Sequence, residues 1–263
     1  MTSCASRWPP RRSLGGMDWR EREGVPWLEA EMPGARAMFS TRQGGVSSGP
    51  FASLNLGWIT GDESENVYEN RRRLARMADF EPANVLTGFQ VHGAEVLRRD
   101  RPVADLPYLR PPEDPPEVDG HATSAIGLAP LVLVADCLPV ALCGPGGVAM
   151  LHCGWRGLAA GIVERGVREI RATAAAVGPG IGPCCFEVGD EVLARFQHLG
   201  DDIVDGRMLN LPEVAARLLA AAGVQDIKRA DLCTSCNPDL FFSHRRDRGE
   251  TGRQAGVVVA SPS

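Results

Sequence analysis

The chain has 263 residues, and its 28 basic and 33 acidic side chains give a formal net charge of −5. A hydrophobic content of 44% and a charged content of 23% are those of an ordinary globular protein, which excludes the collagen, coiled-coil and wholly disordered classes. The negative charge argues against non-specific nucleic-acid binding, and no uninterrupted apolar stretch is long enough to predict a transmembrane helix.

The first 25 residues lack the apolar segment of a secretory signal peptide. We expect residues 1–16 to form a disordered tail and residues 17–263 to form a single domain. Eight cysteines in a chain of this length do not resemble a small disulfide scaffold. We therefore expect a cytoplasmic protein with reduced thiols and no membrane partner, and we favour a monomer.

Hydrophobic periodicity predicts helices and strands that are mixed along the whole chain, with no composition break at a linker. Strands are expected at 35–41, 84–91, 94–98, 131–134, 138–142, 148–151, 227–232 and 255–260, and helices at 62–79, 158–174, 188–199 and 212–222. Asp62 is expected to cap the first helix, with Glu65 at the spacing of a capping box. Six prolines between residues 101 and 118 predict a loop that could act as a mobile lid. One α/β domain is the simplest fold class.

Three side chains with metal-binding or nucleophilic chemistry lie where predicted strands end, namely His92, Cys137 and His152. Active-site groups of α/β proteins gather at strand ends, so these three could converge. Two imidazoles and a thiolate suit a catalytic zinc site, which keeps a fourth position open. Alternatively, Cys137 beside His152 could act as a nucleophile, or the three could be a buried thiol with two hydrogen-bonded histidines. Spacing alone does not decide between these interpretations.

Arg42 and Arg156 lie beside glycines, where a guanidinium and open backbone amides suit a phosphate or carboxylate. Arg156 also precedes a predicted helix N-terminus, which favours an anion. The alternative for each arginine is an ordinary surface salt bridge.

Cys233 and Cys236 form a lone Cys-x-x-Cys motif. A structural zinc site needs a second pair, and the only other close pair, the adjacent Cys184 and Cys185, is expected to chelate poorly. A redox motif would need a thioredoxin-like context, which the surrounding pattern lacks. We therefore interpret Cys233 and Cys236 as packed thiols near a site.

Jointly, the motifs resemble the signature of the YfiH family of laccase-domain proteins over about residues 27–258. The segments that carry the resemblance are Phe39-Ser40-Thr41-Arg42-Gln43-Gly44-Gly45-Val46-Ser47, Ser53-Leu54-Asn55-Leu56-Gly57, Asn70-Arg71-Arg72-Arg73-Leu74, Gln90-Val91-His92-Gly93, Val118-Asp119-Gly120, Ala135-Asp136-Cys137-Leu138-Pro139, His152-Cys153-Gly154-Trp155-Arg156-Gly157, Gly178-Pro179-Gly180-Ile181-Gly182-Pro183-Cys184-Cys185, Cys233-Thr234-Ser235-Cys236 and Ser243-His244-Arg245-Arg246. The departures are small: Cys153 replaces a small residue such as alanine, and His244 replaces a common aromatic.

The resemblance implies a single domain with a layered α/β/β/α core. It also implies purine nucleoside phosphorylase activity, which joins phosphate to the sugar of inosine, guanosine, adenosine or methylthioadenosine, together with adenosine deaminase activity. Zinc would be held by three residues that are also the catalytic candidates: His92, Cys137 and His152. The substrate- and phosphate-binding candidates are Arg42, Asn55 and Arg156, with Arg42 first for phosphate.

Two other functions remain open. Some relatives are assigned to the editing of peptidoglycan precursors, and zinc-activated water suits hydrolysis of a UDP-muramoyl-amino-acid amide equally well. A metal- or thiol-binding protein without turnover is the non-enzymatic alternative. Copper-dependent phenol oxidation, which the family's older name suggests, is disfavoured because a multicopper oxidase needs more than the five histidines of this chain.

Overall fold

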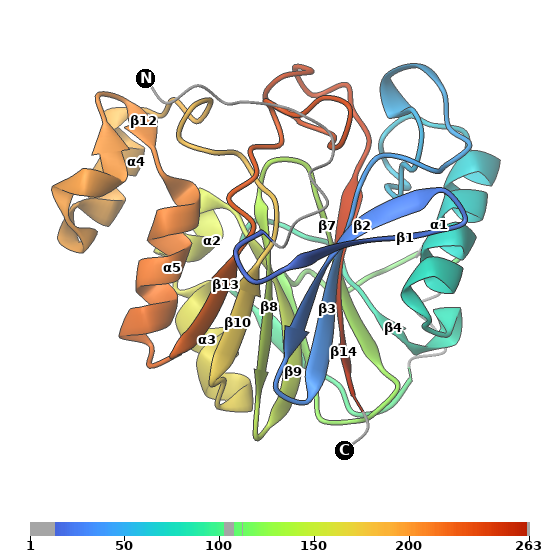
Figure 1. Ribbon diagram of the computed structural model, residues 1–263, viewed down its shortest axis with the longest axis horizontal. Helices are drawn as coiled ribbons and strands as arrows, with labels where there is room; N and C mark the ends of the chain where they lie inside the picture. The colour runs from blue at the N-terminus through green and yellow to red at the C-terminus, as the bar shows by residue number, and fades with distance from the viewer. Residues whose placement is uncertain (1–13, 103–107, 112, 262–263) are drawn as a thin grey trace.

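Two mixed six-stranded sheets pack face to face in the computed structural model, which describes residues 14–102, 108–111 and 113–261 (Figure 1). The first sheet contains, in spatial order, β1 (Asp18–Arg22), β2 (Val25–Met32), β3 (Ala35–Ser40), β14 (Gln254–Ala260), β7 (Ala129–Val134) and β4 (Val85–Leu86). The second contains β13 (Asp226–Arg229), β10 (Ala174–Val177), β8 (Leu138–Gly144), β9 (Gly147–Cys153), β6 (Gly120–Thr123) and β5 (Val96–Arg98). A small hairpin joins β11 (Val204–Asp205) and β12 (Met208–Leu209).

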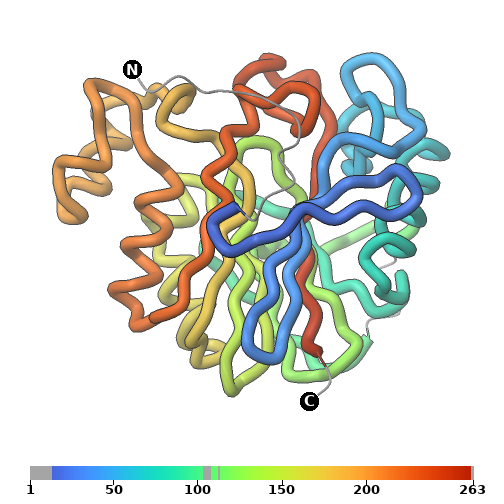
Figure 2. Tube along the Cα trace, in the orientation of Figure 1, coloured from blue at the N-terminus to red at the C-terminus, as the bar shows by residue number. Residues whose placement is uncertain are grey.

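Helices cover the outer face of each sheet (Figure 1). The helix α1 (Ser64–Ala78) packs on the first sheet, whereas α3 (Ile162–Ile170) and α5 (Leu211–Ala221) pack on the second. The shorter helices are α2 (Trp155–Ala159) and α4 (Asp190–Phe196). Segments from the two ends of the chain meet in the first sheet, where β3 pairs with β14 in antiparallel register (Figure 2). The expected α/β fold with an α/β/β/α core is confirmed.

The buried apolar side chains form three layers, one between the sheets and one beneath each set of helices. The alternation along β8 illustrates how one strand serves two layers: Leu138, Val140 and Leu142 face the helices, while Ala141 and Cys143 face the other sheet. Because both faces of such a strand are buried, its sequence is a continuous apolar run. This is why the runs at 131–134, 138–142, 148–151 and 255–260 predicted strands correctly.

The predicted helix at 158–174 is wrong in its extent. Gly161 has a φ of 87°, in the left-handed region, and this separates α2 from α3. At the other end, Arg171 also adopts a left-handed conformation and closes α3. Ala174 then begins β10, which pairs with β8 and β13. The alanine-rich sequence of β10 suits a helix by propensity, but its position between two strands decides its conformation.

The predicted cap at Asp62 is also wrong. Glu63 occupies the N-cap of α1 and makes no side-chain capping bond. The Asp62 carboxylate instead accepts hydrogen bonds from Ser47 Oγ at 2.6 Å and Asn55 Nδ2 at 2.9 Å. The other carboxylate oxygen accepts the backbone N–H of Glu63 at 2.9 Å, so Asp62 links the loop before the helix to the N-cap residue.

Several predicted boundaries shift, and some strands had no prediction. Of 84–91 only Val85–Leu86 is strand, and 227–232 is replaced by Asp226–Arg229. The unpredicted strands are β1, β2, β6, β10, β11 and β12. Most of the expected tail, residues 1–13, and residues 103–107 and 112 of the expected lid lie outside the described residues. Among the described residues, no helix has the length and apolar character needed to cross a membrane.

The break between α2 and α3 gives a direct test of the fold. A Gly161→Ala variant should lose about 1–2 kcal/mol of unfolding free energy, because a Cβ disfavours the left-handed conformation. The nearest atom to that Cβ would be Glu164 Oε2 at 3.5 Å, an ordinary contact, so crowding adds nothing. Gly161→Asn is the control, since asparagine tolerates this conformation better. Urea denaturation measures both, and equal stability of Gly161→Ala and the wild type would contradict a left-handed Gly161.

Candidate active site

The candidate site lies where the chain crosses from one sheet to the other. Cys137 lies in the short connection from β7 of the first sheet to β8 of the second. His92 lies in the connection from β4 to β5, which also crosses between the sheets, and His152 lies near the end of β9. The three side chains offer metal-ligand atoms that all lie within 4.8 Å of one another. The structure therefore brings together the three residues that the sequence singled out.

One buried carboxylate holds both histidines. Asp119, which immediately precedes β6, is fully buried and accepts backbone N–H bonds from Val91 at 3.2 Å, His92 at 2.9 Å and Gly93 at 2.7 Å. It also lies 2.7 Å from Nδ1 of His152. Nδ1 of His152 therefore carries a proton, which it donates to the Asp119 carboxylate, and Nε2 remains available to Cys137 or to a ligand. Asp119 was not among the site residues predicted from the sequence, although the segment Val118-Asp119-Gly120 was part of the family resemblance.

Other contacts fix the Cys137 loop. Asp136 adopts a φ of 89°, and its carboxylate accepts bonds from Thr234 Oγ1 at 2.6 Å and from the backbone N–H of Arg245 at 2.7 Å. These two bonds offset the cost of a conformation that non-glycine residues rarely adopt. Gly154 lies opposite, where an added Cβ would be 2.9 Å from the Cys137 sulfur. A larger residue at 154 would therefore displace the thiol.

The electrostatics of the site favour a thiolate beside an imidazolium when no metal is bound. Burial tends to raise the pKa of Cys137, but the charge of His152 and hydrogen bonds from His152 and His92 outweigh it and lower this pKa to about 6. Burial tends to lower the pKa of His152, but the Cys137 thiolate and the Asp119 carboxylate raise it to about 9. The rings of His92 and His152 meet edge to face, with centroids 4.9 Å apart. A nucleophile or metal ligand at Cys137 is thus charged near neutral pH.

The three side chains open onto a cavity of about 270 Å³. Its apolar wall includes Leu133, Ile181 and Phe186, and its polar wall includes Arg245 and Arg253. Burial lowers the pKa of Arg253. The negative charges of Cys137 and Asp136 lie close enough to oppose part of this change. The cavity therefore combines an apolar surface, two guanidinium groups and the His/Cys/His cluster, a combination typical of small-molecule sites.

The donor set fits zinc. Two imidazoles and one thiolate are the kinds of ligand that zinc prefers, and three protein ligands leave the open position of a catalytic site. A carboxylate behind a metal-binding histidine is a common feature of such sites, and Asp119 occupies that position behind His152. His92, Cys137 and His152 could therefore hold the ion without rearrangement of the backbone that carries them.

The predicted substrate ligands lie outside this lining. The Arg42 guanidinium donates to the carbonyls of Ala52 at 2.6 Å and Pro238 at 3.1 Å and lies over the Phe242 ring. Asn55 is fully buried, and its Oδ1 accepts the backbone N–H of Arg253 at 2.9 Å. Arg156 is exposed at the start of α2 and lies over the Trp155 ring. Asn55 thus contacts the cavity wall through the Arg253 backbone.

Sequence reasoning missed Arg245, Arg253 and Phe186 as residues of the site. Arg245 and Phe186 lie in or next to segments that carry the family resemblance, so those motifs were the available signal. Arg253 lies outside every quoted motif, and only the folded chain brings it to the cavity.

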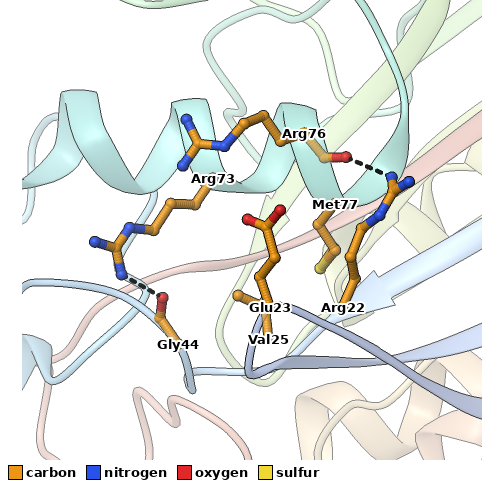
Figure 3. A pocket seen from close by; sticks show the side chains of 7 residues that line it. All are labelled: Arg22, Glu23, Val25, Gly44, Arg73, Arg76 and Met77. Carbon is orange, nitrogen blue, oxygen red and sulfur yellow. Dashed lines mark hydrogen bonds between the residues drawn. The ribbon is translucent and has the colours of Figure 1, made fainter.

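A second cavity, of about 250 Å³, lies between α1 and the turn from β1 to β2 (Figure 3). Arg73 donates to the Gly44 carbonyl across it, and Arg22 donates to the Arg76 carbonyl, both at 3.0 Å. Its lining contains arginines and Glu23 but neither histidine nor cysteine. It therefore lacks the nucleophiles and metal ligands of the first cavity.

The chain is similar to several curated proteins along most of its length. A model of the family described as multi-copper polyphenol oxidoreductase laccase matches residues 36–261. Purine nucleoside phosphorylase YlmD of Geobacillus stearothermophilus is 38% identical in an alignment that covers 90% of this chain and 96% of that protein. Purine nucleoside phosphorylase YfiH of Escherichia coli is 37% identical, covering 86% of this chain and 93% of that protein.

Crystal structures of relatives have the same fold. The hypothetical protein YfiH of Bacillus licheniformis superposes with a TM-score of 0.84 at 31% identity, covering 92% of this chain and 99% of that chain. YlmD of Geobacillus stearothermophilus superposes with a TM-score of 0.79 at 35% identity, covering 92% and 98%. By sequence and by structure, the protein belongs to the multi-copper polyphenol oxidoreductase laccase family, the family of YfiH and YlmD, whose curated relatives compared above are named purine nucleoside phosphorylases.

Proposed function

We propose that the cavity at Cys137 catalyses phosphorolysis of purine nucleosides, with inosine, guanosine, adenosine and methylthioadenosine as substrates, and also deaminates adenosine. The observation that carries this proposal is the convergence of His92, Cys137 and His152 at a cavity whose wall holds two guanidinium groups. The names of the relatives support the phosphorylase reaction. The cavity volume of about 270 Å³ is close to the lower end of small-molecule sites, about 300 Å³, which favours a compact substrate.

Phosphorolysis breaks the bond between the anomeric carbon and the base nitrogen and joins that carbon to a phosphate oxygen. The reaction therefore needs a phosphate site beside the anomeric carbon. Arg245 and Arg253 are the arginines of the cavity lining. One Nη atom of each donates to backbone carbonyls, and the remaining N–H groups of the guanidinium could bind phosphate. Asn55 would contribute by holding the Arg253 backbone rather than by contacting the substrate. Arg42 and Arg156 stay predictions as phosphate ligands.

The departing purine needs a proton on a ring nitrogen, since the neutral base leaves more easily than its anion. His92 is exposed at the cavity, and its ring lies beside that of His152, so a His92 nitrogen could deliver this proton when no zinc ion is bound to it. Asp119 keeps the His152 ring fixed through Nδ1. The apolar wall, including Phe186, would pack against the base and exclude water from the reacting atoms.

The proposed zinc ion would be held by His92, Cys137 and His152. When bound, zinc supplies Lewis-acid chemistry that suits the activation of water for deamination. With or without an ion, hydrogen bonds of Asp119 and Asp136 hold these three residues in position. The absence of a side chain at Gly154 leaves room for the Cys137 sulfur.

Incubation of the purified protein with inosine and phosphate should release hypoxanthine and ribose 1-phosphate, and adenosine should also yield inosine. A Cys137→Ala variant should stay folded and lose both products, while Cys143→Ala, which removes a buried thiol of β8, should keep them. The same preparations with UDP-MurNAc-L-Ser test amide hydrolysis. No base released from any of the four nucleosides, or full activity in Cys137→Ala, would contradict the proposal.

Replacement of Asp119 by asparagine should lower kcat about 10–100-fold, as is usual when the partner of a site histidine is lost. An amide supplies only one acceptor oxygen for the four donors and no charge to hold His152. Asp100→Asn is the matched control, because Asp100 accepts from Ser124 and Arg98 and does not line the cavity. Inosine phosphorolysis measures both, and unchanged kcat in Asp119→Asn would show that the contact is not needed.

The Cys137 thiol should react at unusually low pH in protein stripped of metal. Since its pKa is lowered to about 6, alkylation by iodoacetamide should be half-maximal near pH 6, nearly constant above that and slower below it. His152→Ala should move the midpoint upward, because burial stays and the neighbouring positive charge is lost. Peptide mass spectrometry can follow this thiol separately from the other seven cysteines. A midpoint that does not move in His152→Ala would contradict the ion pair.

A further inference from the structure

Four cysteine sulfurs form a second cluster, separate from the site at Cys137. Cys184, Cys185, Cys233 and Cys236 offer sulfur atoms that all lie within 4.8 Å of one another. The sulfur of Cys236 lies 3.3 Å from that of Cys184 and 3.3 Å from that of Cys185. These four residues come from two loops, one after β10 and one after β13. We propose that they hold a structural metal ion, a zinc tetrathiolate that joins the two loops.

The spacing of the sulfurs suits zinc. Zinc–sulfur bonds of about 2.3 Å in a tetrahedron place neighbouring sulfurs about 3.8 Å apart. The observed contacts of 3.3 Å and the outer limit of 4.8 Å lie on either side of that value. Small movements of the side chains would thus complete the tetrahedron. Four thiolates leave no open position, which is the pattern of a structural rather than a catalytic site.

The adjacency of Cys184 and Cys185 is no obstacle to chelation, contrary to the interpretation from sequence. The chain turns at this point, where the Gly182 carbonyl accepts the backbone N–H groups of Cys185 at 3.0 Å and Phe186 at 3.1 Å. The turn directs both sulfurs toward Cys236. Gly182 permits the close approach, since an added Cβ would lie 3.2 Å from the Cβ of Cys233.

Simple packing does not account for the cluster. Cys233 is buried, but Cys184 is exposed and Cys185 and Cys236 are half-buried, so three of the four thiols add little to a hydrophobic core. A disulfide needs sulfurs about 2.05 Å apart, whereas the Cys236 sulfur lies 3.3 Å from those of Cys184 and Cys185, and all four cysteines are free. Reduced thiols gathered from two loops at these distances match metal ligands better than either alternative.

The surroundings of the cluster offset its charge. Four thiolates and one Zn²⁺ carry a net charge of −2. The backbone N–H groups of Gly182 and Cys236 donate to the Cys233 sulfur. Arg245 lies at the same loops and donates to the carbonyls of Cys185 and Glu187, whereas the charge of Arg246 is paired with Asp247. The backbone donors and the Arg245 guanidinium would stabilise an anionic metal centre.

The metal would support the active cavity from outside it. Thr234, between two of the ligands, donates to the Asp136 carboxylate that fixes the Cys137 loop. Phe186, next to Cys185, and Arg245 both line the cavity. An ion that joins the two loops would therefore hold one wall of the cavity and the support of Cys137 at the same time.

Zinc analysis of the purified full-length chain tests the proposal. The chain with all four cysteines and a Cys143→Ala control should each retain one more zinc per chain than Cys233→Ser/Cys236→Ser after the same mild chelation. The comparison is made in a Cys137→Ala background, which lacks the first site, so that a loss of zinc reports the four-cysteine site alone. Equal zinc content in the double variant and the chain with all four cysteines would overturn the proposal.

Cobalt(II) gives a second readout that does not require the double variant to fold. Cys137→Ala lacks the first site, so metal-free Cys137→Ala titrated with cobalt(II) should develop the intense thiolate-to-cobalt charge-transfer absorption of a tetrahedral four-sulfur site at one equivalent. Absence of this absorption while the thiols titrate as reduced would overturn the proposal. Peptide mass spectrometry that finds these cysteines as disulfides in protein purified without oxidant would also overturn it. Neither readout requires phosphorylase activity, so the outcome is independent of the proposed function.

Discussion

The structure of the site depends on one buried negative charge. Asp119 is fully buried, and a buried carboxylate is stable only when hydrogen-bond donors surround it. Its donors are the backbone of residues 91–93 and the ring of His152, which belong to segments from the edge of one sheet and the interior of the other. The carboxylate is therefore satisfied only when both histidines are in place. The same hydrogen bonds therefore stabilise the buried charge and position the histidines of the site.

The position of the cavity follows from the two-sheet architecture. Cys137 and His92 lie in connections that leave one sheet and enter the other, so their side chains meet at the seam between the sheets. The loops after β10 and β13 cover that seam and contribute Phe186 and Arg245 to its wall. These loops have little regular structure of their own, and both contact Asp136, the loop after β13 through the Asp136 carboxylate and the loop after β10 through its carbonyl. A metal at the four cysteines would add a rigid link to these hydrogen bonds and to the apolar packing of the loops.

The sequence predicted the parts of this molecule in which local pattern and final environment agree. Strands buried on both faces, such as β7, β8 and β9, are continuous apolar runs and were recognised. The exposed edge strand β1 has the polar sequence DWRER, and β10 has a run of alanines, so neither shows a strand pattern. The convergence of His92, Cys137 and His152 was one interpretation of their predicted places at strand ends. In the structure Cys137 and His152 lie next to or within the end of a strand, whereas His92 lies in the connection between β4 and β5. The roles of Asp119 and Arg253 could not be predicted, because each depends on partners distant in sequence.

A crystal structure of the protein with hypoxanthine and ribose 1-phosphate, the products of inosine phosphorolysis, would test the central claim most directly. The account predicts both ligands in the cavity at Cys137, with the base against Phe186, the phosphate on Arg245 or Arg253, and the anomeric carbon facing the His92 and His152 rings. Ligands bound instead in the arginine-lined cavity between α1 and the β1–β2 turn, with the cavity at Cys137 vacant, would contradict it.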